Sequence, residues 1–72
     1  IIGGHRVDFL VEDSVVLELK RRNWIDPADV KQVLMYLRSL ELPLGILACF
    51  GRDKLSYQRV LNKEVLSDVE DL

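Results

Sequence analysis

Three charged residues stand out in the stretch VDFLVEDSVVLELK, which runs from Val7 to Lys20. Read at every second position, one set of its residues is apolar, and the other set contains Asp8, Glu18 and Lys20. Two carboxylates held close together are suitable ligands for Mg²⁺, which prefers oxygen atoms. An amine beside them can stabilise a nucleophile or a developing negative charge. These residue types suit hydrolysis of a phosphodiester bond, provided that the fold brings them onto one face.

The alternating pattern predicts a hairpin of two antiparallel strands, and its loop decides which side chains meet. A two-residue turn would leave Asp8 and Glu18 on opposite faces of the sheet. A three-residue loop over 12–14 pairs Val11 with Val15 instead, and sets Asp8 directly across from Glu18. Opposed Cβ atoms lie about 5 Å apart, so the two carboxylates could then share one divalent cation.

The hydrophobic residues of the hairpin favour the three-residue loop. In that register they form one continuous apolar face, whose burial contributes several kcal/mol at about 25 cal/mol per Å². We therefore expect this face to be buried: Val7, Phe9, Val11, Val15, Leu17 and Leu19. Without a cation, the two facing carboxylates should repel each other and raise one pKa. The simpler alternative is an ordinary cross-strand ion pair of Asp8 with Lys20 on a solvated face.

Beyond the hairpin, whose strands are expected over 5–11 and 15–20, the pattern predicts one helix. It should run over 27–40, with Asp26 as the N-terminal cap and Pro27 in the first turn. Its apolar stripe consists of Val30, Val33, Leu34, Leu37 and Leu40, while Asp29 is expected to point elsewhere. Trp24, in the loop before the helix, is expected mainly to pack next to the helix start; the alternative is that it stacks on a base beside the basic residues that precede it.

Two further strands should follow the helix. The apolar run over 44–50 is typical of a strand buried on both faces, with Cys49 in the core. Residues 54–61 alternate again after a tight turn, and the acidic tail is either a short helix or frayed. The order strand, strand, helix, strand, strand favours a parallel crossover within one mixed sheet, hence an α/β fold.

The composition of the chain argues against several classes of protein. The chain has 72 residues and a formal net charge of −2, which argues against a generally basic nucleic-acid binder but not against a local basic patch. A single cysteine excludes an internal disulfide and favours a reducing, cytoplasmic location. No segment is long and apolar enough to cross a membrane, and the N-terminal residues do not read as a signal peptide.

The spacing of Asp8 and Glu18-Leu19-Lys20 resembles the motif of the PD-(D/E)XK nuclease superfamily. Within it, the sequence over 6–20 is most similar to the small bacterial GxxExxY proteins. Downstream, Gln32 and Tyr36 match the Gln-x-x-x-Tyr pattern of RecB-type members. The strand residues over 44–51 and 57–60 also resemble that family, so the likeness covers about residues 3 to 62.

This resemblance implies a restriction-endonuclease-like mixed sheet and a DNA-cleaving activity that uses Mg²⁺ or Mn²⁺. It implies that Asp8 and Glu18 bind the metal, with the backbone carbonyl of Leu19 as a further ligand, and that Lys20 is the motif lysine. Gln32 would face the same cleft and orient a water molecule or the scissile group. The nuclease-like core would then span 1–62, followed by an acidic tail over 63–72.

Other expectations concern partners. Arg21 and Arg22 follow the motif directly and could grip phosphates, with Tyr36 as a further nucleic-acid contact; a solvated loop is the plainer interpretation. The sequence has no counterpart of the family's N-terminal Gly-x-x-Glu-x-x-Tyr helix, so one carboxylate, this helix and most of one strand would be missing. We therefore expect an uncovered sheet edge or apolar face and a homo-oligomer. A non-catalytic relative that binds nucleic acid or drives assembly is the alternative function.

Overall fold

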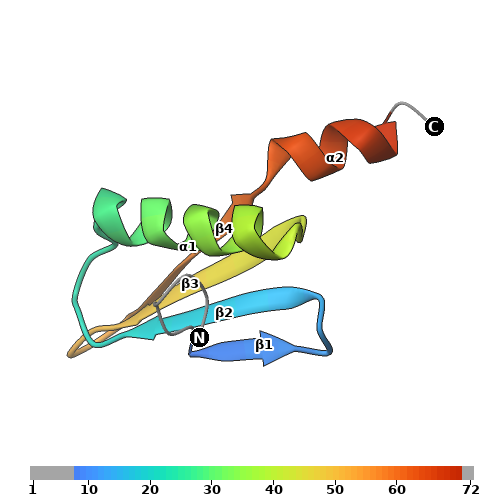
Figure 1. The fold of residues 1–72 in the computed structure, drawn as a ribbon. Helices are drawn as coiled ribbons and strands as arrows, with labels where there is room; N and C mark the ends of the chain where they lie inside the picture. The colour runs from blue at the N-terminus through green and yellow to red at the C-terminus, as the bar shows by residue number, and fades with distance from the viewer. Residues whose placement is uncertain (1–7, 71–72) are drawn as a thin grey trace.

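The computed structural model describes residues 8–70, and a mixed four-stranded sheet is its central element (Figure 1). The elements are β1 (Phe9–Val11), β2 (Val15–Lys20), α1 (Pro27–Leu40), β3 (Leu44–Phe50), β4 (Leu55–Leu61) and α2 (Lys63–Glu70). The strands lie in the order β1-β2-β3-β4. Strand β2 is parallel to β3, and the other two pairs are antiparallel. The predicted α/β class and element order are confirmed; positions 5–7 of the expected first strand lie outside the described residues.

The β1–β2 hairpin has the predicted register. Phe9 pairs with Leu17 and Val11 pairs with Val15, so the loop contains three residues. Glu12 and Asp13 take left-handed backbone conformations, with φ of 50° and 55°. The loop is closed by a hydrogen bond from the amide of residue 14 to the carbonyl of Val11, at 2.9 Å. Continued by one residue, this register sets Asp8 across from Glu18.

Helix α1 connects β2 to β3 and has the predicted bounds. Asp26 caps its first turn, because its side chain accepts a hydrogen bond from the amide of Ala28 at 2.9 Å. The helix stops where Glu41 turns left-handed, with φ of 56°, and donates its amide back to the carbonyls of the last turn. The connection crosses over between parallel strands, as the element order predicted.

The hydrophobic core lies between α1 and one face of the sheet (Figure 1). Gly45 on β3 lets the helix approach closely, since a Cβ there would lie 2.6 Å from Cγ1 of Val33. Cys49 is fully buried, as expected. The buried cluster consists of Val16, Val33, Tyr36, Leu37, Leu47 and Val60.

Two expectations about the burial of the sheet are wrong, and both concern the face opposite α1. Helix α1 packs on the face that carries Val16 and Glu18, so the apolar face of the hairpin is the one left open. Phe9 is 52 % exposed, and no element among residues 8–70 packs over that face. Phe50 at the end of β3 is 49 % exposed, so β3 is not buried on both faces along its whole length. Sequence alternation defines two faces, but it does not say which one the helix covers.

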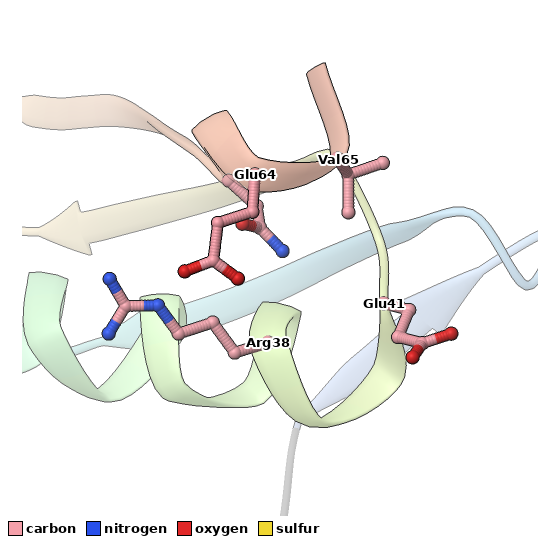
Figure 2. Close-up of a pocket in the computed structure, with 5 residues that line it drawn as sticks. Arg38, Glu41, Glu64 and Val65 are labelled. Carbon is pink, nitrogen blue, oxygen red and sulfur yellow. The ribbon is translucent and has the colours of Figure 1, made fainter. Parts of the chain in front are cut away.

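Asn62 joins the end of α1 to the start of α2. Its backbone amide donates to the carbonyl of Pro43 at 2.9 Å, and its side-chain Nδ2 donates to the carbonyl of Leu37 at 3.4 Å. A hollow of about 360 Å³ opens beside it, where Arg38 and Glu64 extend toward each other (Figure 2). The segment 63–70 is helical, which decides between the two alternatives for the tail. No helix among the described residues is long and apolar enough to span a membrane.

Candidate metal and phosphate site

Asp8 and Glu18 meet at the start of β1, as the register requires. The amide of Asp8 donates a hydrogen bond to Oε1 of Glu18 at 3.3 Å. In return, Oδ2 of Asp8 accepts a hydrogen bond from the amide of Leu19 at 2.8 Å. Each carboxylate therefore accepts a hydrogen bond from a backbone amide on the opposite arm of the hairpin. The predicted acidic pair is therefore assembled by the hairpin.

Glu18 is a buried acid. It is 3 % exposed, on the sheet face that α1 covers. Burial raises the pKa of the Glu18 carboxyl above its usual value of 4.5, and the nearby Asp8 carboxylate raises it further, while Lys20 acts in the opposite direction. A carboxylate buried beside another carboxylate does not fit an ordinary ion pair on a solvated face. Among the described residues, Lys20 forms its ion pairs with Glu18 and Asp29 rather than with Asp8, so the simpler alternative does not hold as stated.

Lys20 lies between two acids. Its Nζ is 3.9 Å from Oε2 of Glu18 and 4.0 Å from Oδ1 of Asp29. Asp29 also pairs with Arg22 through its other oxygen and is only 7 % exposed. Together these contacts hold the ammonium group of Lys20 beside the acidic pair.

The role of Asp29 was missed at the sequence level, where its side chain was expected to point away from the core. Its spacing contained a usable signal. Asp29 precedes Val33 by four residues and Tyr36 by seven, so it continues the buried stripe of α1 by one turn. An acid on such a stripe needs a cationic partner to be buried, and the chain offers Lys20 and Arg22 just before the helix.

The exchange Asp29→Asn is expected to lower the free energy of unfolding by about 1–2 kcal/mol. Removing one partner of a fully buried ion pair costs about 3–5 kcal/mol, and partial solvation of Lys20 and Arg22 reduces this loss. Urea unfolding measures the effect. Asp53→Asn, in the exposed turn before β4, is the matched control and should change stability little. Equal losses in both variants would contradict the ion-pair role.

Gln32 and Tyr36 both lie on α1, the helix that covers the sheet face of Glu18. Gln32 is half-buried and lies about one turn from both Asp29 and Tyr36. Tyr36 is 1 % exposed, and burial raises the pKa of its hydroxyl, with further contributions from the Glu18 and Asp8 carboxylates. Its ring is therefore part of the core beneath the acidic pair. A contact between nucleic acid and Tyr36 would require this packing to change.

The donor set suits a hard divalent cation. Among residues 8–70, no three His, Cys, Asp or Glu side chains gather in a metal-binding group, so a further protein ligand beside Asp8 and Glu18 would be a neutral oxygen. Leu19 offers one, because the N–H and C=O of a strand residue point to the same neighbouring strand. Its amide meets Asp8, so its carbonyl faces that side too. Two carboxylates, one carbonyl and water molecules match the ligands that Mg²⁺ prefers.

Comparison with known proteins agrees with this geometry. Residues 1–60 match the family model of the PD-(D/E)XK nuclease superfamily. The chain belongs to that superfamily. The GxxExxY subgroup and the missing N-terminal helix stay predictions.

The superfamily membership is accompanied by a likeness to one solved structure. The crystal structure of SSO0001 is 22 % identical over 79 % of this chain, with a TM-score of 0.57. This likeness shows a shared fold, and the chain corresponds to 32 % of the length of the SSO0001 chain. A search of curated proteins finds no match.

Proposed function

We propose that this PD-(D/E)XK chain is a metal-dependent deoxyribonuclease, or the catalytic half of one, that uses Mg²⁺ or Mn²⁺. The observation that carries the proposal is the buried carboxylate of Glu18, hydrogen-bonded to the backbone of Asp8 and 3.9 Å from Lys20. Burial of Glu18 beside a second carboxylate costs free energy that Lys20 offsets only in part, and a cation that both acids bind would offset it further.

Each residue has a separate task in this proposal. Asp8, Glu18 and the carbonyl of Leu19 would hold the metal, which supplies an activated water and polarises the phosphate. Lys20 places its positive charge where negative charge develops on the phosphate or on the attacking water. Asp29 keeps Lys20 in position. Gln32, on the helix side of the site, would orient the water or the scissile group.

The test is cleavage of circular DNA in Mg²⁺, in Mn²⁺ and in EDTA. Circular single strands and supercoiled duplex plasmid report cutting without free ends, and linear forms of both report digestion from an end. We expect cutting of at least one substrate in either metal and none in EDTA. No cutting of any of them by a folded protein would favour the alternative, a non-catalytic nuclease-fold module that binds nucleic acid.

We further propose that the chain self-associates through the open apolar sheet face. Val11 is 46 % exposed, Leu61 is 49 % exposed and Tyr57 is 70 % exposed, so removing this face from water would stabilise a dimer. Light scattering after size exclusion, at tens of micromolar protein, should show a dimer or a larger oligomer.

The exchange Val11→Glu is expected to shift that assembly toward monomer, because it places a charge within the face. Gln58→Glu adds the same charge on β4, on the side of the sheet that α1 covers, and is the matched control. A wild-type protein that elutes as a clean monomer would contradict the assembly, as would equal dissociation of both variants.

A further inference from the structure

A second feature lies at the end of the sheet where β2 and β3 finish. The loop after β2 and the turn after β3 enclose an open groove of about 390 Å³. Three arginines and two aromatic residues dominate its lining: Arg21, Arg22, Asn23, Trp24, Phe50, Gly51 and Arg52. Its first residue, Arg21, directly follows Lys20 in the sequence, at the end of β2.

The two loops are fastened to each other. The side-chain oxygen of Asn23 accepts a hydrogen bond from the amide of Arg52 at 2.8 Å. Gly51 permits this close approach, since a Cβ there would lie 2.7 Å from the same Asn23 oxygen. The turn itself is closed by a 2.9 Å hydrogen bond from Gly51 to the carbonyl of Lys54. These hydrogen bonds therefore fix the backbone that forms the floor of the groove.

The side chains above this floor are available for a ligand. Trp24 is 62 % exposed, contrary to the expectation that it packs, and Phe50 is 49 % exposed. Within the described residues, Arg22 pairs with Asp26 and Asp29, whereas Arg21 and Arg52 form no ion pair. Two exposed aromatic rings beside unpaired guanidinium groups are unusual on a surface that has no ligand to bind.

We infer that this groove binds a single-stranded segment of nucleic acid, with phosphates on Arg21 and Arg52 and bases stacked on Trp24 and Phe50. Stacking on an aromatic side chain requires a base face that is not already covered by its neighbours, which a duplex does not offer. Guanidinium groups follow the backbone without reading its sequence. The inference rests on the proposed function and specifies it: the strand held here leads to the acidic pair through Lys20.

Trp24 is the only tryptophan in the chain, so the tryptophan fluorescence of the protein reports directly on the groove. The wild-type protein is titrated in EDTA with an oligothymidine and, separately, with a duplex of equal length, and tryptophan emission is followed. We expect saturable quenching by the single strand and at least about tenfold weaker binding of the duplex. The logarithm of the affinity should fall with the logarithm of salt concentration, with a slope of about −1.4 for two phosphate contacts.

Arginine variants locate the phosphate contact. Arg52→Ala keeps the backbone amide that bonds Asn23, so the groove should persist while the salt slope falls by about 0.7. Arg59→Ala removes the same charge from an exposed position on β4, outside the groove lining, and should leave both affinity and slope unchanged.

A pair of apolar variants locates the stacking contact. Phe50→Ala should weaken the single-strand affinity by about 5- to 150-fold, because each stacked base contributes on this scale. Met35→Ala, which removes a 41 % exposed apolar side chain on α1, outside both the groove and the open sheet face, is the control. Circular dichroism of each variant establishes that it is folded.

The outcomes separate this inference from the proposed nuclease. Quenching in EDTA supports the groove, whether or not the protein cleaves DNA, if Arg52→Ala lowers its salt slope and Phe50→Ala weakens its affinity while both controls keep the wild-type values. Metal-dependent cleavage without any quenching would overturn the groove and leave the nuclease standing. Equal binding of duplex and single strand, or equal effects of the groove and control variants, would also overturn it.

Discussion

Glu18→Gln is expected to abolish metal-dependent DNA cleavage and, at the same time, to stabilise the metal-free protein. The amide keeps the size of the side chain and can still accept the hydrogen bond from the amide of Asp8. It cannot supply a negative charge to a cation, and such charge stabilisation contributes several kcal/mol to catalysis. The rate should therefore fall by at least about 100-fold. Cleavage of the substrate that wild type cuts, in Mg²⁺, measures this loss.

The gain in stability follows from the raised pKa of Glu18. Burial and the Asp8 carboxylate disfavour the ionised form in the folded protein, so folding becomes less favourable as that form is populated. The free energy of unfolding of wild type should decrease as the pH rises from 4.5 through the higher folded pKa, and Glu18→Gln should lack this component. Urea unfolding in EDTA at acidic and neutral pH measures it.

Glu12→Gln, in the exposed loop of the same hairpin, is the matched control for both effects. It should cut DNA at the wild-type rate and keep the wild-type dependence of stability on pH. If Glu18→Gln also cuts at the wild-type rate, Glu18 does not bind the catalytic metal. A metal-free Glu18→Gln protein that is less stable than wild type at neutral pH would contradict the electrostatic explanation.

Lys20→Met is expected to lower the cleavage rate by about 100-fold, the loss typical of removing one group that stabilises a transition-state charge. Metal binding should survive, because Lys20 contributes no ligand and its ammonium group lies 3.9 Å from Glu18, where it opposes a bound cation. The expected result is thus a loss of rate without a loss of Mn²⁺ affinity. Single-turnover cleavage and Mn²⁺ titration measure the two quantities separately.

Lys54→Met is the matched control for Lys20→Met. It removes a charge of the same kind from an exposed position in the turn before β4, and both quantities should stay at their wild-type values. A Lys20→Met protein that loses Mn²⁺ binding as well as activity would indicate that Lys20 holds the structure of the site. Full activity of Lys20→Met would remove Lys20 from the mechanism.

Local patterns predicted the parts of the fold that local physics decides. The register of the hairpin followed from its apolar alternation, and Phe9 pairs with Leu17 as that register requires. The helix bounds followed from Asp26 and Pro27, because capping is a matter of neighbouring residues. The same register brought Asp8 to Glu18, so the acidic pair was predictable before any tertiary structure was known.

The features that were missed depend on packing between distant segments. Alternation alone cannot say which face α1 covers, so the burial of Glu18 and the exposure of Phe9 were not foreseen. The groove requires Asn23 to meet Arg52, a contact across 29 positions that no local pattern encodes. The burial of Asp29 is a different case. Its spacing from the other buried residues of α1 places it on the same helical stripe, but an acidic residue was expected to face solvent.

The central claim is that Asp8 and Glu18 bind one divalent cation. Its most direct test is to titrate Mn²⁺ into isotope-labelled protein and follow the paramagnetic broadening of backbone amide signals, for wild type, Glu18→Gln and Glu12→Gln. We predict selective broadening at Asp8, Glu18, Leu19 and Lys20 in wild type and in Glu12→Gln, and its loss in Glu18→Gln. Broadening confined to the acidic C-terminal residues, or none at all, would contradict the metal site.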